Sequence, residues 1–372
     1  MDIRQNLRAV LHYETFDHMP VLCFGYWKET LEKWVAEGHL PAEALGALAD
    51  GSEADNLVQK KLGFDYNYQT MCYLGAGIQP VFTREVVETK PDGSRIVRNE
   101  FGALIVEKDG AGSIPMEVGH TLVDRASWEK EFLPRLQWSD ARADEVLINS
   151  LKAGDANRHT PLGLHAGSLL GTIRDWLGVE ELCYLYMDDY DLYKEIIDTV
   201  GDLSYRAVKR ALSLYTGFDY LHFWEDICFK NGPLVTPSVF EELVGPHYRR
   251  ITELAAEHGL DIISVDCDGL IDRLIPIWLE NGVNTMFPIE YGTWEASIAP
   301  WREQYGRQLR GVGGMNKNVF ALDYAAVDRE IERLKPLMAL GGYIPCPDHR
   351  IPPDAKFENV QYYCDKMQNL RL

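Results

Sequence analysis

The sequence lacks the features of a membrane protein, a disulfide-bonded secreted protein and a dinucleotide-binding protein. No apolar run reaches the roughly 20 residues that span a bilayer, and the N-terminus has no apolar signal core. The 7 cysteines are odd in number, irregularly spaced and never arranged as CxxC, which suits a reducing compartment. No glycine-rich phosphate-binding motif follows an early strand. We therefore expect a cytoplasmic protein without a membrane segment.

Basic residues are scarce as well. The 37 lysines and arginines are outnumbered by 57 aspartates and glutamates, which gives a net charge of −20. Such a surface repels phosphate backbones and anionic lipid, so the charge argues against binding to nucleic acid or to a membrane surface. A polyanionic substrate is also disfavoured unless the pocket concentrates arginine and lysine.

Short apolar runs alternate with helical periodicity in the second half of the chain. Strands are expected there at 160–165, 219–224, 261–265, 283–288, 309–313 and 342–345, and earlier at 20–24 and 66–73. This alternation predicts a parallel sheet covered by helices. Eight strand–helix units form a closed (β/α)8 TIM barrel, which we expect to be one domain spanning residues 1–372. A doubly wound open sheet is the alternative.

Helices are expected between these strands. One should begin near Leu169 and continue to about Leu214, a second runs from Thr236 to Gly259, and a third covers 270–280. Apolar residues at i, i+4, i+7 and i+11 predict another helix. These are Val327, Ile331, Leu334 and Met338.

Residues 79–120 interrupt the alternation. Residues 81–89 and 95–100 alternate apolar and polar side chains around a turn sequence at 91–94, and 104–107 could add a third strand. We interpret this segment as a β-hairpin or meander inserted into a barrel loop.

In a parallel barrel the catalytic groups lie where the strands end. Residues able to bind metal, exchange protons or contact a substrate recur at these positions. They are Tyr26, His165, Glu225, Asp226, Asp266, Cys267, Asp268, Glu290, Cys346 and His349. Imidazole, thiolate and carboxylate together suit a catalytic zinc with three protein ligands, and they also suit a general acid/base set. The alternative is structural, since Asp-Gly pairs form turns and most cysteines are packing residues. His222, inside a strand, is interpreted as structural.

These strand-end segments resemble the uroporphyrinogen decarboxylase superfamily. The resemblance is carried by Trp224-Glu225-Asp226, 229–234 (FKNGPL), 265–269 (VDCDG), 283–290 (VNTMFPIE), 312–317 (VGGMNK) and 341–353 (GGYIPCPDHRIPP). It implies a (β/α)8 barrel with one of two chemistries. One is cofactor-free decarboxylation of the acetate arms of uroporphyrinogen. The other is zinc-dependent methyl transfer to or from a corrinoid carried by a partner protein.

The stretch 20–28 (PVLCFGYWK) has no arginine, whereas the decarboxylases use an arginine motif there to hold the substrate's carboxylates. The zinc methyltransferases use a His-x-Cys pair where this chain has Val265 and Cys267. Their final ligand position aligns best with His349, close to Cys346. The resemblance therefore implies a zinc site made of Cys267, His349 and Glu225.

Our first hypothesis is a methyltransferase that moves a methyl group between a small methylated substrate and a separate corrinoid protein. The chain has no Asp-x-His-x-x-Gly pattern, so the corrinoid must come from a partner. The expected catalytic residues are His349, Glu225, Asp266 and Asp268, with substrate contacts from His165, Asp226, Tyr26, Glu290 and Cys346. The alternatives are a decarboxylase-like enzyme, favoured by an arginine cluster, and a catalytically silent barrel, favoured by a mouth blocked by residues 79–120. A homodimer is left open.

Overall fold

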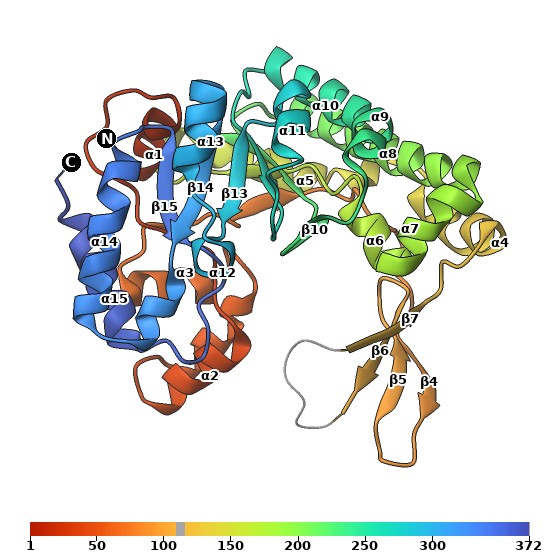
Figure 1. Cartoon of the computed structure of the whole chain (residues 1–372), viewed down its shortest axis with the longest axis horizontal. Coiled ribbons are helices and arrows are strands. Elements are labelled where there is room, and N and C mark those ends of the chain that lie inside the picture. Colours follow the sequence, from red (N-terminus) through yellow and green to blue (C-terminus); the bar gives the residue numbers. More distant parts are fainter. Residues whose placement is uncertain (109–115, 372) are drawn as a thin grey trace.

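A seven-stranded parallel sheet forms the centre of the computed structural model, which describes residues 1–108 and 116–371 (Figure 1). Its strand order is β15-β14-β13-β12-β9-β8-β3, and every pairing is parallel. The strands are β3 (Met71–Tyr73), β8 (Gly163–His165), β9 (Tyr220–Trp224), β12 (Ile263–Asp266), β13 (Thr285–Ile289), β14 (Arg310–Met315) and β15 (Tyr343–Pro347). All residues of β12, β13 and β15 are buried, as expected for a sheet covered on both faces. The predicted strand positions are confirmed.

The first and last expected strands lie next to each other. β1 (Leu22–Cys23) pairs in parallel with β2 (Tyr66–Asn67), which is followed by β3 on the same chain segment. At the other end of the series, Tyr26 forms a parallel bridge with Ile351, just after β15. The Ile351 N–H donates to the Gly25 carbonyl at 3.1 Å, and the Trp27 N–H donates to the Ile351 carbonyl at 3.2 Å. The segments that begin and end the strand series are therefore joined by backbone hydrogen bonds.

Helices connect and cover these strands. They are α1 (Ile3–Leu11), α2 (Lys28–Ala36), α3 (Glu53–Leu62), α4 (Arg125–Ser127), α5 (Glu145–Gly154), α6 (Gly171–Leu177), α7 (Val179–Asp188), α8 (Tyr190–Leu214), α9 (Pro237–Leu243), α10 (Gly245–Glu257), α11 (Ile275–Glu280), α12 (Tyr291–Trp294), α13 (Ile298–Tyr305), α14 (Tyr324–Met338) and α15 (Phe357–Gln368). Among the described residues, no helix is both long and apolar enough to cross a bilayer.

Three helix predictions need correction. The helix expected from Leu169 to Leu214 is three helices, because α6 ends before Gly178, which has a φ of +80°, and α7 ends before Asp189, whose backbone is not helical. The helix expected from Thr236 is divided into α9 and α10 at Val244. The helix expected at 270–280 begins only at Ile275. The apolar periodicity of α14 is confirmed, since all four of its marker residues are buried.

The inserted segment forms a four-stranded antiparallel sheet that projects from the body beside α6 and α7 (Figure 1). Its strands are β4 (Glu85–Thr89), β5 (Arg95–Arg98), β6 (Ala103–Glu107) and β7 (Met116–His120). The predicted turn joins β4 to β5, with Gly93 at a φ of +82°. β7 was not predicted. Residues 109–115 lie outside the described part of the chain.

Candidate functional site

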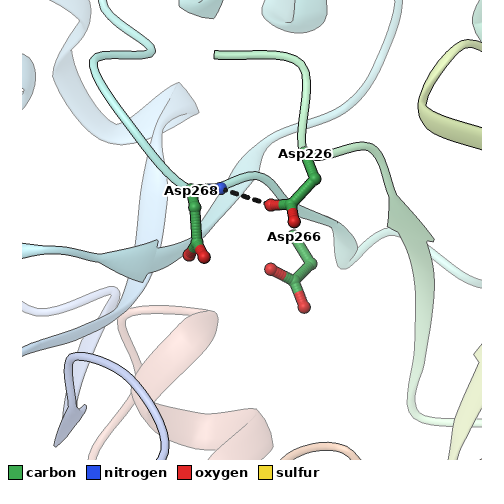
Figure 2. A group of neighbouring side chains, drawn as sticks. All are labelled: Asp226, Asp266 and Asp268. Atoms are coloured by element: carbon green, nitrogen blue, oxygen red, sulfur yellow. Dashed lines mark hydrogen bonds between the residues drawn. The ribbon is translucent and has the colours of Figure 1, made fainter. Parts of the chain in front are cut away.

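Three aspartates converge at the carboxyl ends of two adjacent strands (Figure 2). Asp266 is the last residue of β12, Asp268 follows two positions later, and Asp226 follows β9, the parallel neighbour of β12. Each offers a carboxylate oxygen, and these oxygens lie within 4.8 Å of one another. Side chains alternate along an extended chain, so Asp266 and Asp268 point to the same side and Cys267 between them points away.

The backbone holds the three carboxylates in this arrangement. The Asp268 N–H donates to Asp226 Oδ1 at 3.0 Å, the bond drawn in Figure 2. Asp226 has a φ of +52°, in the left-handed region, and its carbonyl accepts a 2.7 Å hydrogen bond from Arg174. Gly269 also has a positive φ, and a Cβ there would lie 2.7 Å from the Cys228 carbonyl oxygen. The turn after β12 therefore requires glycine.

The cluster concentrates negative charge in a partly enclosed site. Burial, followed by the charges of Asp268 and Asp226, raises the pKa of Asp266 well above its usual value. Burial and the charge of Asp268 likewise raise the pKa of Asp226 to about 6. Gln69 opposes the shift at Asp266 by donating to Oδ2 at 2.7 Å. A cation placed among these oxygens would relieve their mutual repulsion.

His349 borders the cluster on its solvent side. Its Nε2 lies 3.3 Å from Asp268 Oδ2, and the two side chains are 23% and 32% exposed, so a small molecule can reach them. The imidazole stacks on Trp27 with ring centroids 5.6 Å apart and is also packed against Phe24. This predicted residue therefore lies beside another predicted one, Asp268.

Two histidines lie beneath the cluster. His222, which sequence reasoning interpreted as structural, is completely buried, and its Nε2 lies 4.0 Å from Asp266 Oδ2 without a hydrogen-bond partner. Its Nδ1 contacts Ser264 Oγ at 3.1 Å. The His165 ring packs against His222 and Tyr73. Burial lowers the pKa of His165 to about 4, and burial together with His165 lowers the pKa of His222 well below its usual value. Both rings are therefore neutral at physiological pH.

Glu225, an expected metal ligand, is held by hydrogen bonds and does not belong to the group of three aspartates. Its fully buried carboxylate accepts hydrogen bonds from the backbone N–H groups of the first turn of α6 and from two hydroxyl groups. The donors are Leu169, Leu170 and Gly171 at 2.8–2.9 Å, Ser168 Oγ at 3.1 Å, and Tyr248 OH. A Cβ at Gly171 would lie 1.8 Å from the Glu225 carbonyl oxygen, so helix and strand end fit only with glycine at 171.

The cysteines are also placed differently from the prediction. Cys267 is 1% exposed, and its Sγ lies 3.6 Å from the Asp268 carbonyl oxygen. Burial, followed by contact with Cys228, raises the pKa of Cys267 well above its usual value, which favours the thiol over the thiolate that zinc binds. Cys346 is fully buried as well. Among the described residues, the three aspartates are the one group of three or more metal-binding side chains close enough to share an ion. The expected set of Cys267, His349 and Glu225 is not assembled.

The remaining predicted residues support the site from its edges. Glu290, after β13, accepts a 2.6 Å hydrogen bond from the Gly269 N–H and another from the Trp294 indole, so it holds the turn that carries Asp268. Tyr26 is 1% exposed and lies in the core beneath the strand ends. Sequence reasoning missed Gln69, because the expected strand 66–73 is divided and Gln69 lies in the break.

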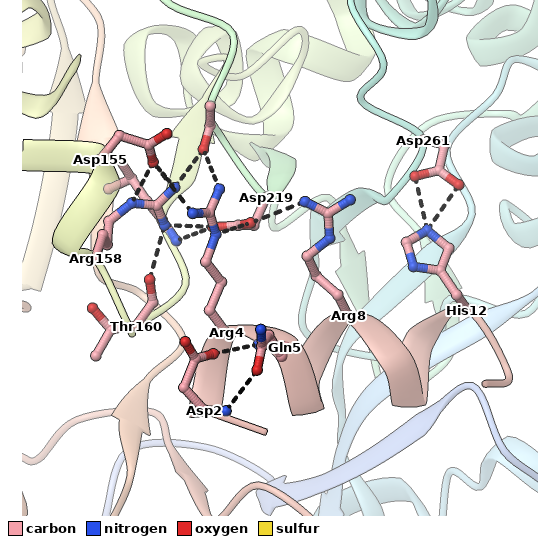
Figure 3. A network of polar contacts seen from close by, with 12 residues as sticks. Asp2, Arg4, Gln5, Arg8, His12, Asp155, Arg158, Thr160, Asp219 and Asp261 are labelled. Atoms are coloured by element: carbon pink, nitrogen blue, oxygen red, sulfur yellow. Dashed lines mark hydrogen bonds and ion pairs between the residues drawn. The ribbon is translucent and has the colours of Figure 1, made fainter. Parts of the chain in front are cut away.

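Carboxylates at the opposite end of the strands are neutralised by arginine (Figure 3). Asp219, before β9, is buried and accepts hydrogen bonds from Arg4 Nε at 2.8 Å and Arg158 Nη1 at 2.5 Å. Its Oδ2 also accepts from the Leu162 N–H at 3.0 Å. This network ties α1 to the amino ends of the strands. The contrast distinguishes the carboxyl end, where the aspartates face one another, as the candidate functional face.

The comparisons with known proteins identify a shared fold. A methyltransferase from Methanosarcina mazei superposes with a TM-score of 0.59 and 15% identity, covering 99% of this chain and 98% of that one. A B12-independent methionine synthase from Shewanella sp. W3-18-1 gives a TM-score of 0.47 and 12% identity over 94% of this chain and 97% of that one. The sequence matches no family model and no curated protein. The resemblance noted from the strand-end segments is thus matched at the level of the fold.

Proposed function

We propose that the chain is a methyltransferase whose reaction takes place at the carboxyl ends of β9 and β12. The observation that carries the proposal is the convergence of Asp226, Asp266 and Asp268 beside His349. These groups lie at the end of a parallel sheet where α/β enzymes hold their catalytic residues. The fold shared with a methyltransferase supports methyl transfer among the reactions that such a site could carry out.

We further propose that the strands close into a single (β/α)8 barrel. The support is the parallel order from β3 to β15, together with the bridge between Tyr26 and Ile351 that links the β1 segment to the β15 segment. Closure would bring the ends of β1, β9, β12 and β15 around one mouth, which explains how His349 meets Asp268.

The zinc site implied by the resemblance does not fit these residues, because Cys267 is turned into the core and Val265 occupies the histidine position. Carboxylate oxygens are instead the preferred ligands of hard cations such as Mg²⁺ and Mn²⁺. His222 provides independent support, since a fully buried imidazole nitrogen without a partner faces Asp266. We assign the metal to Asp226, Asp266 and Asp268. When bound, such a cation would polarise the heteroatom that carries the methyl group.

The acceptor in this proposal is the cobalt(I) of a corrinoid held by a separate protein. The bond between the methyl carbon and its heteroatom breaks, and its electron pair stays on the heteroatom, which takes up a proton. Cobalt(I) supplies the electron pair of the new bond to the methyl carbon. His349, paired with Asp268 and open to solvent, is positioned to deliver that proton.

The two rival functions receive less support. A decarboxylase acting on a polycarboxylate needs arginines free to bind anions, but Arg350 is paired with Asp50 at 2.7 Å and Arg174 with Asp175 at 2.6 Å. A silent barrel would be favoured by a blocked mouth, whereas the inserted sheet projects to one side (Figure 1).

Two measurements test the proposal. Protein stripped with EDTA should gain thermal stability when Mn²⁺ or Mg²⁺ is added, and Asp266→Asn and Asp268→Asn should lose this gain while the exposed control Asp354→Asn retains it. The metal-loaded enzyme should also methylate a cobalt(I) corrinoid protein from one of a panel of methyl ethers, methylamines and methyl thiols, followed by cobalt absorbance. No transfer from any donor, with carbon dioxide released from a carboxylated substrate, would favour the decarboxylase.

A further inference from the structure

A second feature of this face is an apolar pocket of about 300 Å³ between the body and the inserted sheet. It is lined by Ile78, Phe101, Thr172, Asp175, Trp176 and Trp224. Its walls come from the segment after β3, from α6, from the end of β9 and from the turn between β5 and β6. Its volume lies at the lower end of the range for small-molecule sites, which suits a ligand built around a single ring.

Trp224 links the pocket to the aspartate cluster. Trp224 is the registered partner of Asp266 in the parallel pairing of β9 and β12, so the two side chains lie next to each other on the same face of the sheet. His222, two residues earlier on β9, points to this same side and faces Asp266. None of the three aspartates lines the pocket, so Trp224 is the residue through which the pocket and the cluster are neighbours.

The inserted sheet contributes an exposed phenylalanine, Phe101, to the pocket. Phe101 is 56% exposed, yet the turn that carries it is well ordered by hydrogen bonds. Asn99 Oδ1 accepts from the Phe101 N–H at 3.0 Å and from the Ala103 N–H at 2.9 Å. Gly102, next to Phe101, has a φ of +89°, and a Cβ there would contact Phe82 and Phe132 at 3.0–3.1 Å. This turn fixes an exposed aromatic ring at the edge of the pocket.

The charged groups around the pocket compensate each other. Asp175 is the one carboxylate in its lining, and Arg174 binds Asp175 Oδ1 through Nη2 at 2.6 Å and Nε at 3.2 Å. The Arg174 guanidinium also lies 5.8 Å from the centre of the Trp224 ring. A positively charged ligand would therefore be repelled by Arg174, which already lies over the Trp224 ring. An anionic ligand would be repelled by the three aspartates. A neutral ligand is repelled by neither group.

We infer that this pocket binds the neutral aromatic ring of the methyl donor, an aryl methyl ether, with its methylated oxygen directed toward Asp226 and Asp266. The inference rests on the proposed function and names its substrate class. The indole of Trp224 and the ring of Phe101 supply flat apolar surfaces for a ring of this size, and Trp176, which is 1% exposed, is part of the wall behind them. The inserted sheet then has a role, because it completes the substrate pocket.

Equilibrium binding of methoxybenzene tests this, measured by calorimetry and by tryptophan fluorescence. Phe101→Ala should weaken binding by about fivefold or more, as expected for losing one aromatic contact. Phe229→Ala removes a phenylalanine of similar exposure, 50%, that does not line the pocket, and should leave the affinity unchanged. Trp224→Phe keeps an aromatic wall, so it should retain binding with a smaller fluorescence change.

Equal affinity of Phe101→Ala and the parent protein would overturn the inference, and so would tighter binding of tetramethylammonium than of methoxybenzene. The outcome is separable from that of the proposed function because binding requires no methyl transfer. Methyl transfer from methylamines without methoxybenzene binding would refute the pocket assignment alone. Methoxybenzene binding without methyl transfer from any donor would support the pocket and refute the function.

Discussion

Replacing Glu225 with glutamine tests whether Glu225 anchors the structure or binds a metal. The carboxylate accepts five hydrogen bonds, two at Oε1 from Leu169 N–H and Tyr248 OH, and three at Oε2. A glutamine amide keeps one accepting oxygen, so at least one buried backbone N–H faces the new NH2 group without an acceptor, while the hydroxyl on that side can turn to accept from it. Each unsatisfied donor costs about 1–3 kcal/mol, and we expect the free energy of unfolding to fall by about 3 kcal/mol.

A fall of this size is measurable by calorimetry. An unfolding entropy of about 2.1 cal/mol/K per residue over 372 residues gives about 0.8 kcal/mol/K, so Tm should fall by about 4 °C. The exposed control Glu303→Gln should leave Tm within about 1 °C. The folded Glu225→Gln protein should bind Mn²⁺ as the parent does. An unchanged Tm combined with lost metal binding would refute the reasoning and restore Glu225 as a ligand.

Three further predictions concern Asp219, His12 and Cys267. Asp219→Asn leaves two arginines without their buried partner and should lower the free energy of unfolding by about 3 kcal/mol in urea titrations; an effect below about 0.5 kcal/mol would contradict the buried pairing. The hydrogen bond between His12 and Asp261 raises the pKa of His12 and lowers that of Asp261, so its contribution is present below the usual histidine pKa and disappears as pH rises through the raised value. His12→Ala should therefore destabilise the protein by less than about 1 kcal/mol at pH 5.5 and not at pH 9, whereas an equal loss at both pH values would argue against the ion pair. Cys267→Ser should retain the metal-induced stabilisation, and its loss would place the thiol back in the metal site.

The periodicity of the sequence was sufficient to predict the main elements. Buried parallel strands appear as short apolar runs and surface helices as a 3.6-residue repeat. Each of the eight expected strand segments therefore contains a strand, with 66–73 divided into β2 and β3, and the apolar face of α14 is found where predicted. The turn at 91–94 was also predicted correctly, because the turn requires a positive φ and Gly93 adopts one. Helix ends were less certain. The apolar periodicity continues across the breaks at Gly178 and Val244, so it did not locate them.

The sequence also located the candidate site at the strand ends, since residues such as Asp266, Asp268 and His349 follow apolar runs directly. It did not determine which side chains face one another. Only the extended backbone after β12 turns Cys267 into the core while its two neighbours point outward. Only strand pairing brings Asp226 to Asp266 and places Trp224 beside them.

Tertiary contacts alone decided the roles of the remaining groups. Glu225 and Asp226 are adjacent in sequence, yet the first is saturated by the N-terminus of α6 and the second joins the acidic cluster. Gln69, in the turn between β2 and β3, and His222, on β9, both reach Asp266 although they are far from it in the chain. Local sequence specifies the strands and helices because their periodicity is set by neighbouring residues. The site depends on groups that meet only when the sheet is assembled, and no spacing along the chain encodes those distances.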